Sequence, residues 1–579
     1  MKNRGTPRSK GYRGFRAAAF TAALFVIGLA SGAGLLRAAA QSPPPGTPAP
    51  QPTALQGSPG APSPEAPASG EPVPAASTAP PAGTPASPGA APTQPPIIVE
   101  PPSAGVGPGG TQMLRVLRSL GTLSLTVADP NVATATVDQI ARTLTITGRA
   151  VGNTTVTLSD SRGLTRDIAV RVALAAGSLA SSTTVRITGN PATSLFVKEQ
   201  ALAAALRAAT VRPGAKIVAP VDAIDLDSSL NIDDVVTVSV PIILQGDPYF
   251  TVQGTTRVRV INDAQPPVRP GELLVSDYPE TLKENGTLFS AGLSDRAALR
   301  FLYYHYNPGG QPDRRIVLKV ANAATQPARV QFIDGSGGPG PYEMEAGHNS
   351  TETFLVHLAQ NEGTVLTIPG QTTVTLYQQL LPAKSVVSGI LQLHEIEGPP
   401  LQLALLAQNA GDPIDGPLLP EALLAGGPPH ARGVYPIPEF FFDYSYQCDG
   451  PDLEMPIGQI PLPNMVEGQT LAGDYGVLQQ ITVRMVNNDP RNAREVALYA
   501  NPRGGGATGT FIIDRVLVQA HQMAAFGRYK LREYVIPPGS FVRTEITTMP
   551  EGGSSYPLRL IVAPDDGSAP PGAPESPVY

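Results

Sequence analysis

Three observations predict a mainly β, multidomain protein. Apolar and polar residues alternate with period two in many short runs after residue 111, and turn residues separate the runs. Proline and glycine are abundant, at 64 and 59 of 579 residues, while charged residues make up only 15%. A chain of this length is too long for one hydrophobic core, so we expect several domains.

Residues 1–40 have the pattern of an export signal. Six basic residues occupy the first 16 positions, an apolar run follows, and Ala38, Ala39 and Ala40 supply small residues for cleavage. The run is about 20 residues long, so an uncleaved membrane anchor is the alternative. In either case the segment engages the membrane during export, and we expect the protein in the periplasm or at the cell surface.

Export also changes the charge of the chain. The first 40 residues carry seven basic residues and no acidic one, so cleavage takes the net charge from −6 to −13. An acidic mature protein is not suited to binding nucleic acid.

Residues 41–96 form a predicted disordered tether. They contain 19 prolines, and Glu65 and Glu71 are their only charged residues. Such a segment buries too little apolar surface to fold and behaves as an extended spacer. A disordered tail of similar composition is predicted at residues 564–579.

Residues 97–175 carry the clearest β pattern. Leu123, Leu125 and Val127 alternate with polar residues, and the same alternation recurs around residues 144–146, 156–158 and 168–172. Turn sequences rich in Asp, Asn and Gly separate these runs. About six short strands at this spacing predict a small β-sandwich.

The sequences VADPNVATATV and LTITGRAVGNTTVTLSDSRG, in residues 127–163, carry a family resemblance. They resemble bacterial immunoglobulin-like domains of group 2, and equally the pilus formation protein N-terminal domain. The resemblance extends over about residues 100–173 and implies an immunoglobulin-like sandwich with no catalytic residues. The remainder resembles uncharacterised exported bacterial β-domains.

Residues 178–263 are predicted to form a small α+β module. A helix is expected at residues 196–210, with Thr193 or Ser194 as its cap, and strands are expected on either side. Its loop holds a cluster of acidic residues that begins like a calcium loop but lacks the required Gly and Glu. A solvated acidic loop and a weak calcium site are therefore the two interpretations of Asp222, Asp225, Asp227, Asp233 and Asp234.

Residues 272–410 and 431–563 are predicted to be two related antiparallel β-sandwiches. Ile316–Asn322 matches Ile481–Asn487, and residues 401–407 match residues 558–563 as closing strands. A nearly constant spacing between such pairs indicates a duplication.

The sequence predicts no catalytic, cofactor-binding or firm metal site. Two G-x-G-x-x-G segments, at residues 335–340 and 504–509, lack the strand-loop-helix context that dinucleotide binding needs. The histidines are scattered singly. The single cysteine, Cys448, lies beside aromatics and is interpreted as a buried small apolar residue.

Aromatic residues cluster near the start of each predicted sandwich, and we expect part of each cluster to present a surface to a ligand or partner. This hypothesis rests on strand alternation, which sends neighbouring side chains to opposite faces. The residues concerned are Tyr303, Tyr304, Tyr306, Tyr444 and Tyr446. Packing inside the protein is the alternative.

Three functions remain open from the sequence. The first is a non-enzymatic envelope protein that presents β-sandwich modules for adhesion, scaffolding or ligand binding. The second is an accessory component of a pilus or secretion apparatus, and the third is an enzyme with an unrecognised site. The expected partners are other envelope proteins, pilus components or glycans.

Overall fold

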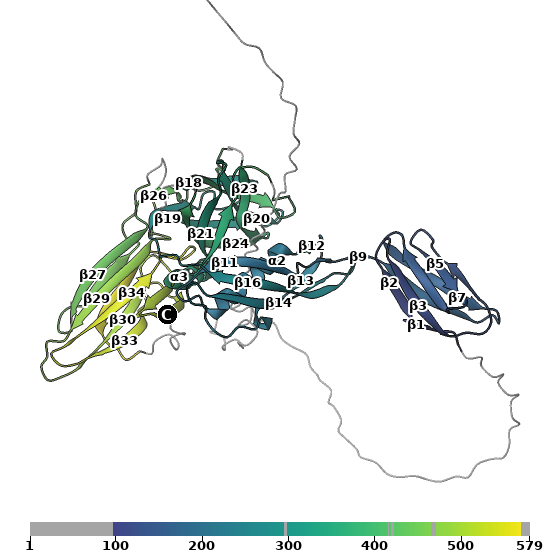
Figure 1. The fold of residues 1–579 in the computed structure, drawn as a ribbon. Coiled ribbons are helices and arrows are strands. Elements are labelled where there is room, and N and C mark those ends of the chain that lie inside the picture. The colour runs from purple at the N-terminus through teal and green to yellow at the C-terminus, as the bar shows by residue number, and fades with distance from the viewer. Residues whose placement is uncertain (1–95, 294–297, 415, 419–421, 465–469, 569–579) are drawn as a thin grey trace, which may run out of the picture. The chain divides into compact units, whose positions relative to one another are not determined.

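The computed structural model describes residues 96–293, 298–414, 416–418, 422–464 and 470–568 (Figure 1). The predicted signal segment, all but the last residue of the predicted tether, and residues 569–579 of the predicted tail lie outside these ranges. The described chain is mainly β, and neither of its two α-helices is long and apolar enough to cross a membrane. It divides into two compact units, with the boundary between Leu174 and Ala175.

The first unit is the predicted immunoglobulin-like sandwich. One sheet has the strand order β1-β3-β6-β5 and the other β2-β8-β7-β4. The strands are β1 (Ile98–Glu100), β2 (Ser103–Val106), β3 (Thr111–Arg118), β4 (Leu123–Val127), β5 (Ala133–Asp138), β6 (Thr143–Gly148), β7 (Gly152–Asp160) and β8 (Thr165–Val172). The apolar positions of the alternating runs, such as Leu144, Val156 and Ile168, are fully buried between the sheets.

The second unit contains the α+β module. Its main elements are β11 (Ser182–Thr188), α2 (Ser194–Ala208), β13 (Lys216–Val218), β14 (Val235–Gln245) and β16 (Val252–Asn262). The short elements are β10 (Gly177–Ser178), β12 (Thr210–Val211), β15 (Tyr249–Phe250) and a 3-10 turn, η1 (Val221–Ala223), while the two-residue strand β9 (Leu174–Ala175) spans the boundary between the units. The Thr193 hydroxyl accepts from the backbone N–H of Phe196, so the predicted cap is confirmed.

The first sandwich follows in the same unit. Its strands are β17 (Pro270–Ser276), β18 (Gly286–Leu293), β19 (Ala298–Asn307), β20 (Arg314–Asn322), β21 (Ala328–Gly340), β22 (Gly363–Ile368), β23 (Thr372–Leu381), β24 (Ser385–Glu397) and β25 (Leu401–Asn409). One sheet has the order β18-β25-β20-β23. The other is continuous with the α+β module, because β11 pairs antiparallel with β22.

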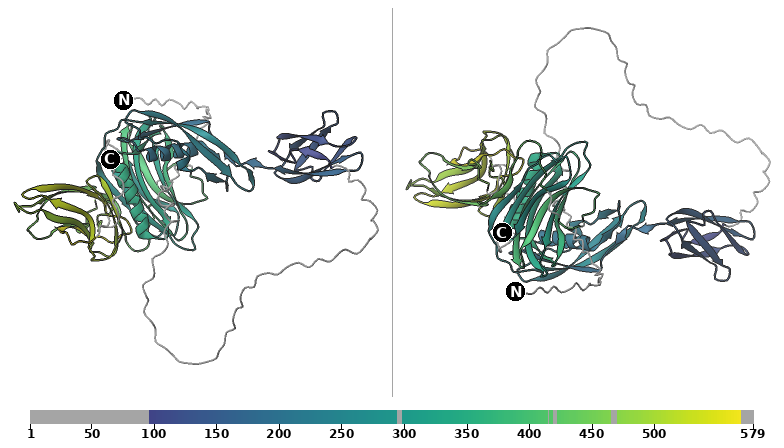
Figure 2. Two further views of the ribbon diagram at one scale, coloured as in Figure 1. Left: turned by 90° about the horizontal axis from the view of Figure 1, so that it is seen from below. Right: turned by 90° about the horizontal axis from the view of Figure 1, so that it is seen from above.

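The result is a ten-stranded sheet of order β13-β14-β16-β11-β22-β21-β24-β19-β17-β26, in which β26 spans Arg432–Tyr435. The predicted boundary between residues 263 and 272 therefore lies inside a continuous sheet. Figure 2 shows the green first sandwich between the teal α+β module and the yellow second sandwich.

The second sandwich repeats the topology of the first, strand for strand. Its strands are β27 (Glu439–Gln447), β28 (Leu453–Ile457), β29 (Leu478–Val486), β30 (Arg494–Pro502), β31 (Ala507–Ile513), β32 (Val516–Met523), β33 (Tyr529–Ile536), β34 (Phe541–Thr548) and β35 (Leu558–Pro564). The order β27-β29-β34-β31-β32 reproduces β17-β19-β24-β21-β22, and β28-β35-β30-β33 reproduces β18-β25-β20-β23. The two sandwiches are thus related, as predicted.

Two details of the prediction need correction. The match of Ile316–Asn322 with Ile481–Asn487 is wrong by one strand, because it aligns β20 with β29, whose topological equivalent is β19. The sandwiches are also not purely antiparallel, since β17 pairs parallel with β19 and β27 parallel with β29. In both copies the intervening strand lies in the opposite sheet, so the chain returns in its original direction.

Helix α3 (Glu343–Gln360), which joins β21 to β22, is not among the elements predicted from the sequence. Acidic residues occupy its first turn, and Asn361 ends it in the left-handed conformation with φ of 55°. The first glycine-rich segment lets this helix approach the sheet, because a Cβ on Gly337 would overlap the carbonyl oxygen of Ala346. That segment is therefore a packing feature at the end of β21.

Replacing Thr188 with valine tests the seam between the α+β module and the first sandwich. The buried Thr188 hydroxyl donates to the Asn361 carbonyl at 2.6 Å and accepts from the Gln331 amide at 2.8 Å. Thr188→Val should cost about 1–3 kcal/mol of unfolding free energy, because two buried polar groups lose a partner. Urea denaturation measures this cost. The exposed Thr184 on the same strand is the matched control, and Thr184→Val should change stability by less than about 0.5 kcal/mol. Equal effects would contradict the assignment.

Candidate functional site

The first and second sandwiches meet around Arg300, a fully buried side chain on β19. Its guanidinium donates to the Pro438 carbonyl at 2.8 Å, to Glu439 Oε1 at 3.0 Å and to Gln392 Oε1 at 3.3 Å. It also lies over the Phe354 ring of α3. Burial lowers the pKa of Arg300, and the Glu439 carboxylate opposes that shift.

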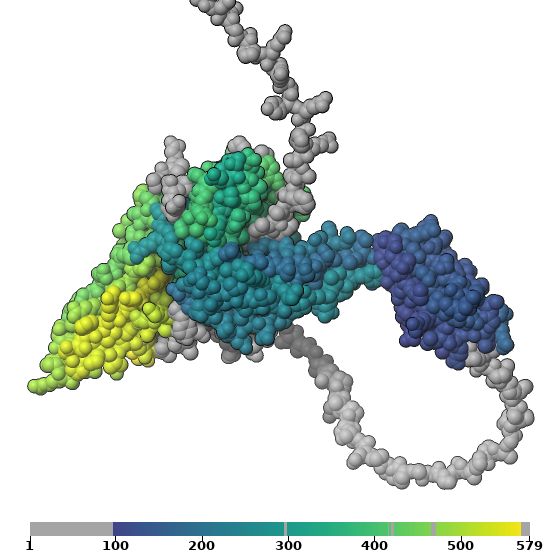
Figure 3. Space-filling model, in the orientation of Figure 1, coloured from purple at the N-terminus to yellow at the C-terminus, as the bar shows by residue number. Residues whose placement is uncertain are grey.

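Strand alternation explains why this arginine faces the second sandwich. Phe301 and Tyr303 point into the core between the two sheets of the first sandwich. Leu302 belongs instead to a second cluster, which includes residues of α3 and of the second sandwich. Arg300 shares the face of Leu302, so it is buried in the joint. Figure 3 shows the yellow and yellow-green surface of the second sandwich adjoining the green surface of the first.

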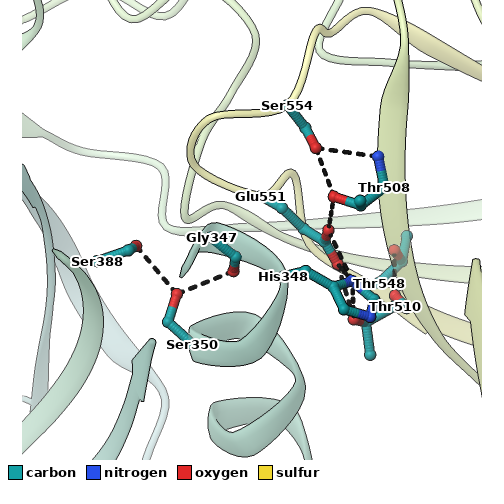
Figure 4. Close-up of polar contacts among 9 residues, drawn as sticks. All are labelled: Gly347, His348, Ser350, Ser388, Thr508, Thr510, Thr548, Glu551 and Ser554. Atoms are coloured by element: carbon teal, nitrogen blue, oxygen red, sulfur yellow. Dashed lines mark hydrogen bonds and ion pairs between the residues drawn. The ribbon is translucent and has the colours of Figure 1, made fainter. Parts of the chain in front are cut away.

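A second polar group lies where α3 meets the second sandwich, and we call it the junction cluster. It consists of His348, Thr508, Thr510, Glu551 and Ser554, all of which are buried (Figure 4). The Glu551 carboxylate lies 3.0 Å from His348 Nδ1 and accepts from Thr510 Oγ1 at 2.7 Å and from Thr508 Oγ1. The Ser554 hydroxyl accepts from the Thr508 backbone N–H at 3.0 Å.

The junction cluster contains residue types that also serve in general base catalysis. Such a role would need a nucleophile beside the imidazole and access for a substrate. The nearby Ser350 hydroxyl instead donates to the Gly347 carbonyl at 2.9 Å and lies 3.0 Å from Ser388 Oγ. Glu551 is completely buried, so the arrangement acts as a polar lock between α3 and the second sandwich.

The helix must come very close to the second sandwich for this lock to form. A Cβ on Gly347 would overlap the carbonyl oxygen of Gly552, the residue after Glu551. Glycine at position 347 is therefore required by the approach of the two backbones.

A more accessible titratable group lies at the edge of the first sandwich. His430 Nε2 lies 3.0 Å from Glu280 Oε2, and His430 Nδ1 lies 3.3 Å from Asp277 Oδ2. The hydrogen bond with Asp277 raises the pKa of His430, and burial raises the pKa of Asp277 to about 6. Within the described ranges, no group of three or more His, Cys, Asp or Glu residues is arranged to hold a metal ion.

The predicted calcium residues do not converge. Asp222, Asp225, Asp227, Asp233 and Asp234 are all exposed. The Asp234 carboxylate accepts from the backbone and side-chain N–H groups of Asn231, both at 3.1 Å. The structure therefore favours the solvated-loop interpretation of this segment.

The predicted aromatic surface is largely wrong, because three of its five tyrosines are buried. Tyr303 donates to Gln379 Oε1 at 2.6 Å inside the first sandwich, and Tyr304 packs in the joint near Gly552. Tyr446 belongs to the core of the second sandwich. Tyr306 and Tyr444 are partly exposed, and Tyr444 packs against the same core. Alternation did send neighbours to opposite faces, but the joint covers the second face of β19.

Cys448 is partly buried and packs against the core of the second sandwich. Burial raises the pKa of its thiol. Both features fit the predicted role as a small apolar residue.

Two buried pairs were not predicted from the sequence. Arg300 and Glu439 are 139 residues apart, and His348 and Glu551 are 203 residues apart. Neither spacing belongs to a motif, so a fold was needed to bring them together. The one available signal was the pattern of acidic residues and Asn361 that bounds α3.

Comparison with known proteins bears on the first unit. Residues 102–173 match the family model of the pilus formation protein N-terminal region. This match confirms the resemblance found in the sequence. The matched region coincides with the immunoglobulin-like sandwich, which occupies a small part of the chain.

No curated protein matches the chain. Among solved structures, domains 4 and 5 of the S-layer protein SbsC share 23% identity over 13% of this chain and 44% of that chain, with a TM-score of 0.12. SbsC domains 5–6 share 15% identity over 29% and 97% of the two chains, with a TM-score of 0.13. The Bacteroides ovatus protein SGBP-B, solved with a mixed-linkage heptasaccharide, shares 13% identity over 52% and 71%, with a TM-score of 0.12. Likenesses at this level say nothing about what the chain binds.

The joint around Arg300 can be tested with a matched pair of substitutions. Arg300→Met should cost about 3–5 kcal/mol of unfolding free energy, because it removes one partner of a buried pair. Arg269 is 74% exposed and lies 3.9 Å from the same Glu439 carboxylate. Arg269→Met should therefore cost at most about 1 kcal/mol. Urea denaturation compares the two, and similar costs would show that the joint does not depend on Arg300.

His305 provides a test of pH dependence. It is fully buried, with Nδ1 3.0 Å from the Pro279 carbonyl oxygen and Nε2 3.2 Å from Ser276 Oγ. Burial lowers the pKa of His305 to about 4. Below about pH 6.5 His305 becomes protonated in the unfolded chain but stays neutral in the folded protein, so the free energy of unfolding falls as the pH drops. Between pH 7 and 5 the wild type should lose about 2 kcal/mol more than His305→Gln.

His430 supplies a control of opposite sign. Because the pKa of His430 is raised in the folded protein, its protonation adds to the free energy of unfolding. This stabilisation is fully present below about pH 6.5 and is lost as the pH rises through the folded-state pKa. His430→Gln should therefore lose more stability than the wild type between pH 7 and 5. Urea denaturation at both pH values decides the question, and an unchanged slope in His305→Gln would contradict its burial as a neutral ring.

Proposed function

We propose that the protein is a non-enzymatic, exported scaffold of the bacterial envelope that holds β-modules in fixed positions. The observation that carries this proposal is the use of polar residues in the second unit. Arg300 and the junction cluster bind across joints, where a substrate has no access. The Arg300–Glu439 and His348–Glu551 contacts each join the first sandwich to the second, and a buried polar group that loses its partner is costly. These contacts therefore favour a fixed arrangement of the two sandwiches over a chemical role.

The second candidate function is that of an accessory component in a pilus or secretion apparatus. The family match at residues 102–173 favours it. The outer face of β3 offers a surface for a protein partner, because the apolar side chains of Met113 and Leu117 are 63% and 58% exposed. Exposed apolar residues on one strand face suit a protein contact better than a sugar.

In vivo crosslinking tests this second function. The tagged full-length chain is expressed in the bacterium that encodes it, crosslinked mildly and purified, and the captured proteins are identified by mass spectrometry. Recovery of secretin or pilin subunits is the expected result. The double variant Met113→Lys, Leu117→Lys should reduce that recovery about tenfold, because lysines must be desolvated on binding.

Ile140 supplies the matched control in the same domain. It is 96% exposed and lies outside β3, in the turn between β5 and β6. Ile140→Lys should leave capture unchanged. Capture of other envelope proteins alone would favour the general scaffold, whereas a defined turnover lost on one His or Asp change would overturn both proposals.

A further inference from the structure

The two sandwiches differ in whether further strands pair with the edges of their equivalent sheets. In the first copy, β26 pairs antiparallel with the outer edge of β17, and β11 pairs antiparallel with the outer edge of β22. In the second copy, the equivalents β27 and β32 end a five-stranded sheet. Among the strands that the structure describes, none continues the sheet beyond β27, which lies at the outer margin of the second sandwich in Figure 1.

Two backbone hydrogen bonds fix which residues of β27 face this edge. The Pro438 carbonyl accepts from Leu478, and the Cys448 N–H donates to Val486, so even-numbered residues turn their backbone groups towards β29. Backbone groups alternate sides along a strand. The odd-numbered residues, including Asp443 and Ser445, therefore direct their N–H and C=O groups away from β29.

β27 lacks the usual protections of an edge strand. Its nine residues, EFFFDYSYQ, contain no proline, glycine or lysine, and its register with β29 is unbroken. Natural edges are commonly shortened, bulged or guarded by lysine or proline. The other edge strands of the second sandwich show such features, because β28 contains Pro456 and the registers of β32 and β33 with their neighbours are irregular.

The chain itself is a poor source of a covering strand. Residues 41–96 and 564–579 are rich in proline, which cannot donate to a sheet ladder. The charge of β27 does not oppose self-association, because Glu439 already pairs with Arg300 across the joint. Asp443 is the other charged residue of the strand.

We propose that the outer edge of β27 binds a second copy of this chain through its own β27, in antiparallel orientation. The two strands that extend the equivalent sheet of the first copy, β11 and β26, both pair antiparallel with it. We therefore expect the second copy to pair with β27 in the antiparallel direction as well. A two-fold axis at Phe442 places Asp443 opposite Phe441 of the second copy and avoids a pair of facing carboxylates. The contact is self-complementary and closes on itself as a dimer.

Sedimentation equilibrium of the purified full-length chain tests the proposal. The wild type should form a dimer. Ser445→Pro removes an N–H that points to the open edge and leaves the pairing with β29 intact, and such positions tolerate proline. Each dimer loses two symmetric hydrogen bonds, so the dimer dissociation constant should rise about tenfold or more. Ser445→Ala keeps the N–H and should leave the constant unchanged.

Hydrogen exchange gives a second measurement that does not depend on the folding of a variant. The outward N–H groups of β27 should exchange more slowly as the wild-type concentration rises. The proposal is overturned by a wild type that stays monomeric, by a Ser445→Pro dimer as tight as the wild type, or by exchange in β27 that is independent of concentration. A chain that stays monomeric and binds an extended segment of another protein at β27 would also overturn the proposal, because the occupant of the edge would then not be a second copy.

Discussion

A buried guanidinium governs the second unit. Arg300 can lose its water only if acceptors surround it, and two of them, the Pro438 carbonyl and Glu439, belong to the second sandwich. The first sandwich therefore carries a side chain that is satisfied only when its neighbour is in place. This constraint joins the two copies into one cooperative body.

The joint also explains how two copies of one fold came to differ. In the second copy, β31 turns directly into β32 through Asp514 and Arg515, both with positive φ. In the first copy the same connection contains α3, which supplies Phe354 beneath Arg300 and His348 to the junction cluster. The inserted helix is thus the element that turns a pair of sandwiches into an assembly. It depends in turn on glycines at positions 337 and 347, where a side chain would separate the backbones.

Local patterns predicted much of the fold. Alternation located the strands of the immunoglobulin-like domain, and a threonine cap located α2, because both signals lie within a few residues. The duplication was also visible, but its alignment slipped by one strand. Asn307, Asn322 and Asn487 each end or follow a strand, and each side-chain amide donates to a carbonyl in its own loop and to one at the end of another strand. Because the same asparagine arrangement occurs at the ends of two successive strands of the first copy, the sequence alone does not show which of these strands corresponds to β29.

The site could not be predicted in the same way. A buried arginine and a buried glutamate have no local signature, and their partners are more than a hundred residues away. The prediction of an aromatic surface failed for a related reason. Strand alternation predicts an outward face of β19, but the second sandwich covers that face in the structure. Alternation gives the face of a strand but not what covers that face.

The continuous sheet has a mechanical consequence. β11 lies between β16 and β22, and its hydrogen bonds to both run across the strand direction. A pull on the chain ahead of Ser182, directed along β11, loads these bonds together in shear, and strand separation requires them to break at once. A module joined by a flexible loop would instead extend one contact at a time. The seam at β11 therefore resists extension along the strand more strongly than a flexible connection at the same place would.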